Sequence, residues 1–408
     1  MMHLRPALTR ALAAAVLAST SLACSSSTSA VDATADAGAT VDAAAATDAT
    51  PAPDAAAPDA ESAPDAGAPD LGVVDSGPTY AEAVTAAQWR VLPNAPRLTR
   101  GKQDDVYFTT PLRGYAVNGP LNRIYRTLDG GDTWQRVYTS TGTYFRSLEF
   151  VDDLHGFAGN LGPIPGSRNT DTNVLYETQD GGDTWAPVTT ISGPMPRGIC
   201  NQTKIDAQNL IGVGRVTGPS HLIRSSDSGA TWASTDLGQH FSMLIDARFT
   251  TPTEGIVIGG SAGADMRCAI YRTTDGTTFT NVFTGSASNS LCWKISFPTP
   301  MIGYVSIQNT QPGARSAIAK TTDGGQTWME LPVLDGPYSS IGVGFITADI
   351  GWLSSDNPAQ PTLRTLDGGL TWTPDPILSS PINRFRFVDE RTAYAIGGQI
   401  YKLDITWP

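Results

Sequence analysis

The sequence is short of several kinds of residue, and each shortage argues against a class of protein. Only four histidines and four cysteines occur among its 408 residues, and no histidine stands at a ligand-like spacing from a cysteine. A metal centre is therefore not expected, and no cofactor is predicted. Acidic residues outnumber basic ones by 39 to 27, and nothing indicates the basic domain that nucleic-acid binding requires. No stretch shows a helical periodicity of useful length.

Aromatic and basic residues are both missing from a long segment near the start of the chain. Residues 25–78 contain nine aspartates and Glu61 but no lysine or arginine, and the first aromatic residue is Tyr80. Such a composition cannot bury enough apolar surface to offset chain entropy. We therefore predict that residues 25–85 form a disordered acidic tether. Without these ten acids and the two arginines before them, the net charge changes from −12 to −4.

The first 24 residues have the features of an export signal. Arg5 and Arg10 flank the apolar residues 11–18, a run too short to span a bilayer. The run leads to Leu22-Ala23-Cys24, which resembles a bacterial lipobox, although the family's preferred leucine stands three residues before the cysteine rather than two. The resemblance implies that Cys24 carries a lipid that anchors an exported protein to a bacterial membrane. The alternative is ordinary cleavage near this site, with the cysteine an incidental thiol.

What the chain does contain is a repeat of the pattern Ser/Thr-x-Asp-x-Gly-x-Thr-Trp. It first occurs at residues 127–134, and the aspartates of successive copies stand 51, 47, 48, 48 and 44 residues apart. These aspartates are Asp129, Asp180, Asp227, Asp275, Asp323 and Asp367. The copy around Asp275 is one residue shorter and ends in Phe279 instead of tryptophan. A period of roughly 40 to 50 residues is typical of one four-stranded propeller blade, and the aspartate and glycines suit a hairpin turn.

The two ends of the repeat region complement each other. Residues 383–402 repeat the first three strands of a blade, but no copy of the turn follows them. Residues 88–91 resemble the strand after the first turn, with nothing before them. Pairing the two ends would complete a seventh blade and close the ring, which removes exposed sheet edges. We therefore predict an all-β protein, in which residues 86–408 form one seven-bladed propeller of four-stranded antiparallel blades.

The repeated pattern resembles the Asp-box, or BNR, repeat of sialidases, sortilin-type receptors, xyloglucanases and photosystem II stability/assembly factors. A single seven-bladed ring with Asp-Gly-Gly-x-Thr-Trp turns and an export signal is most similar to the photosystem II stability/assembly-factor type. The resemblance implies that the six aspartates are structural and lie on the face opposite the binding site. It also implies a non-catalytic binding role, while the photosynthetic partner is not carried over to this chain.

Basic and aromatic side chains indicate a binding surface on the face with the longer loops. They are Arg146, Arg197, Lys294 and Arg384, early in predicted first strands, with Trp293 beside the lysine. Photosystem assembly-factor relatives use an arginine-rich patch, so the resemblance implies a site for an acidic protein or peptide partner in the cell envelope. The alternative is scattered, solvated charges and a tryptophan that is simply packed.

No catalytic residue is predicted. The Arg-Ile-Pro motif of sialidases does not occur, and a glycosidase needs two facing carboxylates at a defined separation. The candidates for such a pair are Asp105, Asp246, Asp265 and Asp356. A glycan-active enzyme or carbohydrate-binding propeller is therefore the alternative to a monomeric, non-catalytic binding protein.

Three cysteines follow Cys24. Cys200 and Cys292 stand at the same position in predicted blades 3 and 5, too far apart to pair. Cys268 begins a strand of blade 4 beside blade 5, so a Cys268–Cys292 disulfide would leave Cys200 buried and unpaired. Three buried free thiols are the alternative.

Overall fold

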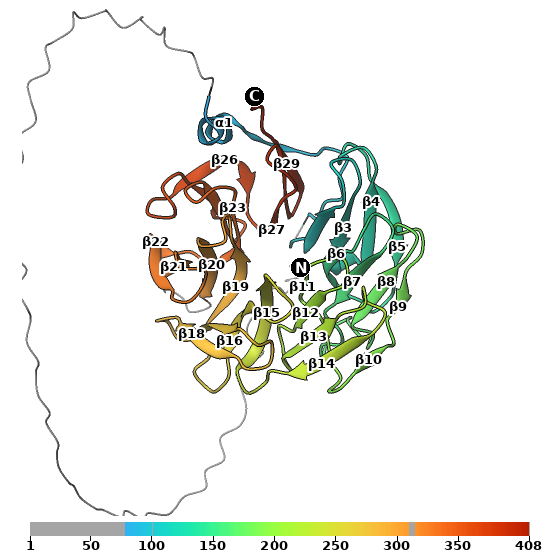
Figure 1. Cartoon of the computed structure of the whole chain (residues 1–408). Helices are drawn as coiled ribbons and strands as arrows, with labels where there is room; N and C mark the ends of the chain where they lie inside the picture. Colours follow the sequence, from blue (N-terminus) through green and yellow to red (C-terminus); the bar gives the residue numbers. More distant parts are fainter. Residues whose placement is uncertain (1–77, 100, 310–314, 408) are drawn as a thin grey trace, which may run out of the picture. The chain divides into compact units, whose positions relative to one another are not determined.

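The computed structural model describes residues 78–99, 101–309 and 315–407. In this part of the chain the strands form seven sheets arranged in a ring, which is a seven-bladed β-propeller (Figure 1). The predicted fold is confirmed. The signal peptide, the lipid anchor at Cys24 and most of the predicted tether lie outside the described residues.

Each of the first six blades is a meander of consecutive antiparallel strands, whose first strand lies nearest the middle of the ring (Figure 1). Blade 1 consists of β2 (Asp105–Phe108), β3 (Gly114–Asn118), β4 (Arg123–Thr127) and β5 (Gln135–Thr139), with a 3-10 helix, η1 (Gly119–Leu121), between β3 and β4. Blade 2 consists of β6 (Phe145–Phe150), β7 (Gly156–Asn160), β8 (Leu175–Thr178) and β9 (Ala186–Pro187). Blade 3 consists of β11 (Asn201–Lys204), β12 (Leu210–Gly214), β13 (His221–Ser225) and β14 (Trp232–Asp236), with β10 (Ile191–Ser192) added parallel to β14.

The remaining blades follow the same order. Blade 4 consists of β15 (Phe241–Phe249), β16 (Gly255–Ser261), β17 (Cys268–Thr273) and β18 (Thr280–Thr284). Blade 5 consists of β19 (Ser290–Ser296), β20 (Gly303–Asn309), β21 (Arg315–Thr321) and β22 (Met329–Pro337). Blade 6 consists of β23 (Ser340–Phe345), β24 (Gly351–Ser355), β25 (Pro361–Thr365) and β26 (Thr373–Ser379). Blade 7 consists of β27 (Ile382–Phe387), β28 (Thr392–Gly397), β29 (Ile400–Asp404) and β1 (Trp89–Val91).

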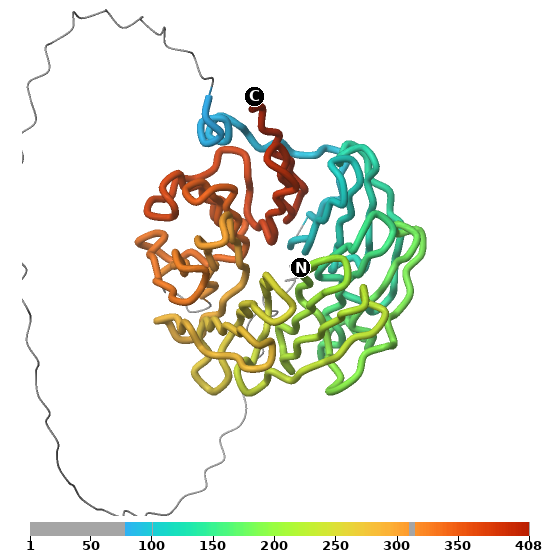
Figure 2. Tube along the Cα trace, in the orientation of Figure 1, coloured from blue at the N-terminus to red at the C-terminus, as the bar shows by residue number. Residues whose placement is uncertain are grey.

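Blade 7 joins the two ends of the propeller, as the sequence predicts. Strand β1 pairs antiparallel with β29, with Trp89 opposite Leu403 and Val91 opposite Tyr401. Figure 2 shows this blue N-terminal segment passing beside the red C-terminal strand. The Trp89 ring is buried and packs edge-on against Trp352 of blade 6 at a centroid distance of 5.3 Å. The closing strand therefore contributes to the core as well as to the sheet.

Regular structure is present before the predicted boundary at residue 86. A short helix, α1 (Tyr80–Ala86), starts at a capping box in which Thr79 and Glu82 exchange hydrogen bonds. Ala83 and Val84 are buried in the core cluster shared by blades 6 and 7. Because only two small apolar side chains are buried, the sequence shows no helical periodicity, and the last residues of the predicted tether belong to the propeller.

The repeated segment forms the turn between the third and fourth strands of blades 1–6. In the first copy, Asp129 accepts hydrogen bonds from the Thr127 hydroxyl at 2.8 Å and the Thr133 backbone N–H at 2.9 Å. Hydrogen bonds from Thr133 above all lower the pKa of Asp129 to about 2. Gly130 and Gly131 have positive φ angles of 71° and 98°. The aspartate thus organises the backbone of the turn.

These turns define one face of the ring. The Gly130 N–H donates to the carbonyl of Leu112 at 2.8 Å, so the repeated turn lies beside the turn between the first and second strands of its blade. We call this side the turn face. The opposite side, with the second-to-third-strand loops and the connections between blades, is the loop face. The hydrophobic core lies between neighbouring blades, as where Tyr115 of blade 1 stacks on Phe150 of blade 2 at 4.1 Å.

Candidate functional site

The first strands of the seven blades surround the middle of the ring (Figure 1). Several charged side chains on or beside these strands are buried. The buried ionisable side chains on or beside these strands are Asp104, Asp105, Arg146, Glu149, Asp246, Lys294 and Arg384. Burying a charge is costly unless it is paired or hydrogen-bonded. The contacts of these side chains therefore show what the middle of the ring is built to hold.

Asp104 is the centre of a first cluster. Its carboxylate lies 2.9 Å from Arg146 Nη1 and 3.1 Å from Lys102 Nζ. Both cations also lie over the ring of Trp293, the guanidinium at 5.0 Å and the ammonium at 5.6 Å from its centroid. The indole N–H donates to Asn383 Oδ1 at 3.1 Å. Residues from blades 1, 2, 5 and 7 thus meet in one buried polar cluster.

Asp105 is held by two arginines of blade 7. Arg386 donates to both of its oxygens, at 2.8 and 3.2 Å, and Arg384 Nε lies at 3.4 Å. The backbone N–H groups of Val106 and Leu148 also donate to this carboxylate. Burial by itself would raise the pKa of Asp105, but Arg386 and then Arg384 lower it below its usual value. This aspartate is therefore fixed in its ionised form.

Asp246 and Lys294 form a third buried pair. Asp246 Oδ2 lies 3.5 Å from Arg384 Nη1 and 3.8 Å from Lys294 Nζ. The Lys294 ammonium has no hydrogen-bond partner among the described residues. Burial, together with repulsion from Arg384, lowers the pKa of Lys294 to about 7. A buried ammonium in this state would gain from an additional anion.

Glu149 differs from the three aspartates because no salt bridge in the described structure involves it. It is 5% exposed, and burial raises its pKa to about 7, against the opposing effects of Arg386 and Tyr107. Near neutral pH this carboxyl group is therefore only partly ionised.

A cavity of about 310 Å³ opens among these side chains. We call it the central cavity; Tyr107, Glu149, Lys204, Asp246, Arg384 and Arg386 are among its lining residues. Several of them lie near the ends of their first strands, which lead to turns on the turn face. Lys204 is exposed, and its Nζ donates to the carbonyl of Val151 at 3.0 Å. The cavity thus connects the buried charges with an exposed cation.

Four of the five residues proposed from sequence as a binding surface converge in the middle of the ring. Arg146, Trp293, Lys294 and Arg384 are all at least nine-tenths buried, so they do not form the exposed patch that the sequence suggested. The reason is that first strands are innermost, and the side chains early in them point into the ring. Arg197 is not part of this group: it is exposed and precedes β11 on the connection from β10.

Sequence reasoning did not single out several residues of this site. Asp104, Lys102, Glu149 and Arg386 were not proposed, and Asp105 and Asp246 were considered only as catalytic candidates. Two sequence features could have indicated these residues. One is the pair of aspartates at the start of the first strand of blade 1, and the other is the Arg-x-Arg spacing of residues 384 and 386. Asp265 and Asp356 lie elsewhere, the former paired with Arg267 at 2.8 Å and the latter accepting from Gln308 at 2.9 Å.

The cysteines adopt the pairing that the sequence allowed. Cys268 and Cys292 are joined by a disulfide that links blades 4 and 5, while Cys200 is buried and outside any disulfide. Among the residues that the structure describes, no group of three or more His, Cys, Asp and Glu side chains could hold a metal ion. No helix in the same part of the chain is long and apolar enough to cross a membrane.

Comparison with known proteins identifies the fold and leaves the family open. No family model matches the sequence, and no curated protein matches it significantly. Among solved structures, YCF48 bound to D1 peptide matches with a TM-score of 0.55 and 18% identity, over 78% of this chain and 97% of that one. YCF48 from Cyanidioschyzon merolae matches with a TM-score of 0.59 and 17% identity, over 78% and 99%.

Enzymes share the same architecture. The GH74 xyloglucanase from Xanthomonas campestris matches with a TM-score of 0.51 and 16% identity, over 78% of this chain but only 53% of that chain. At these identities the similarity shows a common fold and does not transfer a ligand or a reaction. The structure thus establishes a seven-bladed β-propeller whose structural neighbours include both a peptide-bound protein and a glycoside hydrolase.

Proposed function

We propose that the protein is a non-catalytic propeller that binds an acidic segment of a protein partner in the cell envelope, tethered to the membrane by a lipid on Cys24. The central site carries more cations than ionised acids, and this observation carries the proposal. Lys102, Arg146, Lys294, Arg384 and Arg386 face Asp104, Asp105 and Asp246. Lys294 and the fourth acid, Glu149, both have a pKa of about 7, so each is only partly charged near neutral pH. Four cations, Lys102, Arg146, Arg384 and Arg386, still face three aspartates.

A carboxylate from a partner suits this imbalance. Hydrogen bonds between guanidinium or ammonium groups and carboxylates are stronger than neutral ones, and a water-poor site strengthens them further. Arg384 and the exposed ammonium of Lys204 both line the central cavity, so they give such a ligand an inner and an outer contact. The peptide bound by YCF48 supports a peptide ligand, because it shows that a propeller of this architecture can hold one.

The aspartates of the site are engaged in ways that do not favour acid–base catalysis. A general acid or base needs a pKa near the working pH, whereas ion pairs with Arg386 and Arg384 lower the pKa of Asp105. Asp104 and Asp246 are each within 3.5 Å of an arginine. These contacts favour a fixed charge arrangement for recognition.

Capture from an envelope extract tests the proposal. We expect the purified protein to retain a protein partner at low salt and to lose it as the salt concentration rises, because exposed charges are screened. Lys204→Glu should weaken capture, since it reverses the charge at the mouth of the central cavity. Arg136→Glu is the matched control, because Arg136 is exposed on the outer strand β5. Salt-insensitive capture, equal for Lys204→Glu and the wild type, would contradict the proposal.

Arg146 is unsuitable for this test, although the sequence first suggested it. Its replacement by Glu would bring a second carboxylate against the buried Asp104, which the arginine now pairs with at 2.9 Å. Loss of binding would then reflect loss of folding. Arg197 is exposed and can be reversed safely. Arg197→Glu therefore tests whether the loop face takes part in binding the partner.

Glu149 favours a second candidate function, a glycan-active enzyme. A buried carboxyl group with a pKa near 7 is the usual form of a general acid, and Glu149 lines the central cavity together with Asp246. A screen of the purified protein on chromogenic glycosides tests this candidate. Turnover that Glu149→Gln abolishes, in a protein that remains folded, would replace the binding proposal with the enzymatic one.

A further inference from the structure

Neighbouring blades are fastened together on the turn face by a recurrent tyrosine. At three seams, a tyrosine of one blade's second strand donates its hydroxyl to a turn carbonyl of the next blade. These bonds are Tyr115 to Gly181 at 2.9 Å, Tyr304 to Ala348 at 2.6 Å and Tyr394 to Gly130 at 2.9 Å. The same rings stack on Phe150, Phe345 and Phe108 of the next blade, with centroids 3.5 to 4.1 Å apart.

At two of these seams, a cation of the same blade as the tyrosine also donates a hydrogen bond to the turn of the next blade. Arg126, on the third strand of blade 1, donates to the Gly181 carbonyl at 2.7 Å. Lys320, at the same place in blade 5, donates to the Gly368 carbonyl at 2.9 Å. The turn of the following blade is thus held by a phenol and a cation from the preceding one.

The seam between blades 4 and 5 has neither of these contacts. Ile256 stands at the position of the tyrosine, and its side chain has no hydroxyl to donate. Arg272 stands at the position of the cation, but it pairs with Glu254 of its own blade. The Phe297 ring of blade 5 is covered by the guanidinium of Arg248, at 4.3 Å from its centroid.

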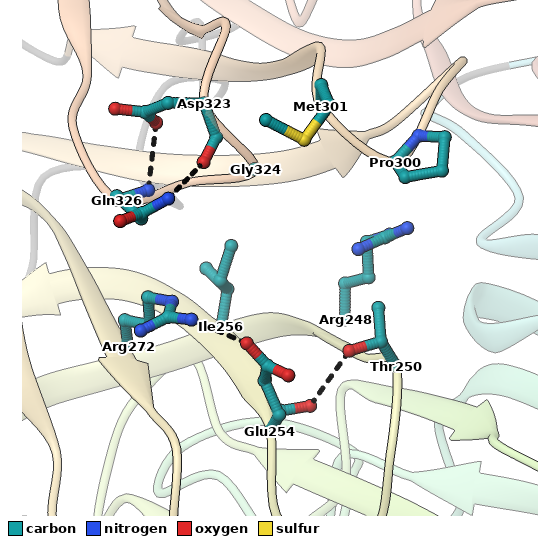
Figure 3. A pocket seen from close by; sticks show the side chains of 11 residues that line it. Arg248, Thr250, Glu254, Ile256, Arg272, Pro300, Met301, Asp323, Gly324 and Gln326 are labelled. Carbon is teal, nitrogen blue, oxygen red and sulfur yellow. Dashed lines mark hydrogen bonds and ion pairs between the residues drawn. The ribbon is translucent and has the colours of Figure 1, made fainter.

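A cavity of about 330 Å³ lies at this seam, between the two blades. We call it the seam cavity. Figure 3 shows Arg272, Ile256 and Arg248 on one side, facing Gln326, Met301 and Pro300 on the other. The volume falls within the range of about 300–1,000 Å³ that is usual for small-molecule sites. A single pocket therefore presents guanidinium groups and apolar surface together.

Some charged side chains around the seam cavity have a salt-bridge or hydrogen-bond partner in the described structure, and others do not. Asp323 is occupied by its own turn, where it accepts from the Thr321 hydroxyl and from the backbone of Gln326 and Thr327. Arg248 forms no salt bridge with any acid among the described residues. Burial lowers the pKa of Arg248, with no neighbouring carboxylate to raise it. The two acids that line the cavity thus have other partners, Glu254 pairing with Arg272 and Asp323 with its own turn, and neither forms a salt bridge with Arg248.

We propose that the seam cavity is a second ligand site and binds a small aromatic carboxylate. The carboxylate lies on Arg248 and on the guanidinium nitrogens of Arg272 other than Nη2, which bonds Glu254. The aromatic ring of the ligand lies against Ile256, Pro300 and Met301. Three other seams carry a tyrosine ring beside the corresponding position. Stacking on a guanidinium adds to the affinity of an aromatic body over an aliphatic one. This site shares Arg248 with the central cavity proposed for the acidic partner, but Arg272, Pro300 and Met301 line the seam cavity alone.

Benzoate and its neutral counterpart benzamide are the probes for this site. We expect titration calorimetry on the purified protein to show saturable benzoate binding and at least about tenfold weaker benzamide binding, because benzamide cannot form the charge-assisted hydrogen bonds. Arg272→Gln should weaken benzoate binding by about tenfold or more. This variant is decisive because Arg272 lines the seam cavity and not the central cavity, whereas Arg248 lines both. Arg136→Gln, on an exposed outer strand, should leave the affinity unchanged.

Filling the cavity gives an independent test. Ile256→Tyr would introduce the side chain found at three other seams, and we expect it to abolish benzoate binding and to raise the melting temperature. Should that variant fail to fold, Arg272→Gln still decides. Three results would each overturn the proposal. They are equal binding of benzoate and benzamide, an unchanged benzoate affinity in Arg272→Gln, and the absence of saturable binding at benzoate concentrations well above about 1 mM. Lys204→Glu, the central-cavity variant expected to weaken partner capture, should leave benzoate binding intact, which separates this site from the one proposed for the partner.

Discussion

Arg386 of blade 7 donates hydrogen bonds to both carboxylate oxygens of Asp105 in blade 1, at 2.8 and 3.2 Å. The two residues are 281 positions apart in the sequence, and their pairing holds the first strands together where the ring closes. Without Arg386, the buried Asp105 keeps only the longer 3.4 Å contact with Arg384 and the backbone donors Val106 and Leu148, so it loses its closest cation. We expect Arg386→Met to lower the free energy of unfolding by about 3–5 kcal/mol.

Urea denaturation measures this effect. Arg391→Met is the matched control, because Arg391 is exposed in the same blade, and its stability should stay within about 0.5 kcal/mol of the wild type. The double variant Asp105→Asn with Arg386→Met should recover part of the loss, since it removes both charges. A single variant as stable as the control would show that the pair contributes nothing to closure.

Glu149 gives the stability of the protein a defined pH dependence. Burial raises its pKa from 4.5 to about 7, so the folded state binds the proton more tightly than the unfolded state. The resulting stabilisation is complete below pH 4.5 and is lost as the pH rises through about 7. In Glu149→Gln this loss is absent. The stability of the variant relative to the wild type should therefore increase by an amount on the order of 3 kcal/mol between these pH values.

Denaturation curves at a series of pH values check this prediction. Glu390→Gln serves as the control, because Glu390 is exposed and should show no such change. A constant difference between Glu149→Gln and the wild type across the pH range would mean that Glu149 titrates normally.

The closing strand β1 should be essential for stability. A chain that begins at Pro78 keeps α1 and β1, and we expect it to melt like the full-length protein. A chain that begins at Leu92 loses β1 and exposes the edge of β29, so its melting temperature should fall substantially. In the intact chain, Trp89→Ala should cost about 3–5 kcal/mol, because the ring is 4% exposed. Equal melting of the two truncated chains would contradict the role given to β1.

The aspartate of the repeated turn should matter for stability and not for partner binding. Asp129→Ala removes the acceptor for the Thr127 hydroxyl and the Thr133 backbone N–H. Because the turn is exposed, we expect a loss of only about 1 kcal/mol. Asp132→Ala, three residues later in the same turn, is the control. Loss of partner capture by a fully folded Asp129→Ala protein would instead make this turn part of the binding surface.

The lipid anchor is tested by cell fractionation. If Cys24 carries the lipid, Cys24→Ala should move the protein from the membrane fraction to the soluble envelope fraction. Cys200→Ala is a suitable control, since that thiol is buried in the propeller. A Cys24→Ala protein that stays with the membrane would exclude the anchor.

Much of the fold could be predicted because the repeat is local. Each copy of the turn is stabilised by hydrogen bonds within seven residues, such as those between Thr127, Asp129 and Thr133, so a short pattern is sufficient to reveal it. The closure by Trp89 was also predictable, because the missing strand at one end matched the extra strand at the other. Helix α1 was missed because its seven residues bury only Ala83 and Val84.

The candidate site was only partly predictable, and the reason is geometric. Alternation along a strand shows that Arg146, Lys294 and Arg384 point to the same side of their strands as the residues two positions away. It does not show whether that side faces solvent or the middle of a ring. The sequence also gives no means of pairing Asp104 with Arg146 or Asp246 with Arg384, since these contacts join different blades. Arg197 follows the same pattern in sequence and yet lies outside the site.

The sequence by itself determined the number of blades, the turns between their last two strands and the way the ring closes, because those features rest on contacts between residues close in the chain or on a simple count of strands. Only the tertiary structure decided which charges meet at the centre, that Glu149 is buried outside the described salt bridges, and where the seam between blades 4 and 5 opens a cavity. Those features depend on side chains from separate blades, and their burial sets both the ion pairs and the pKa values.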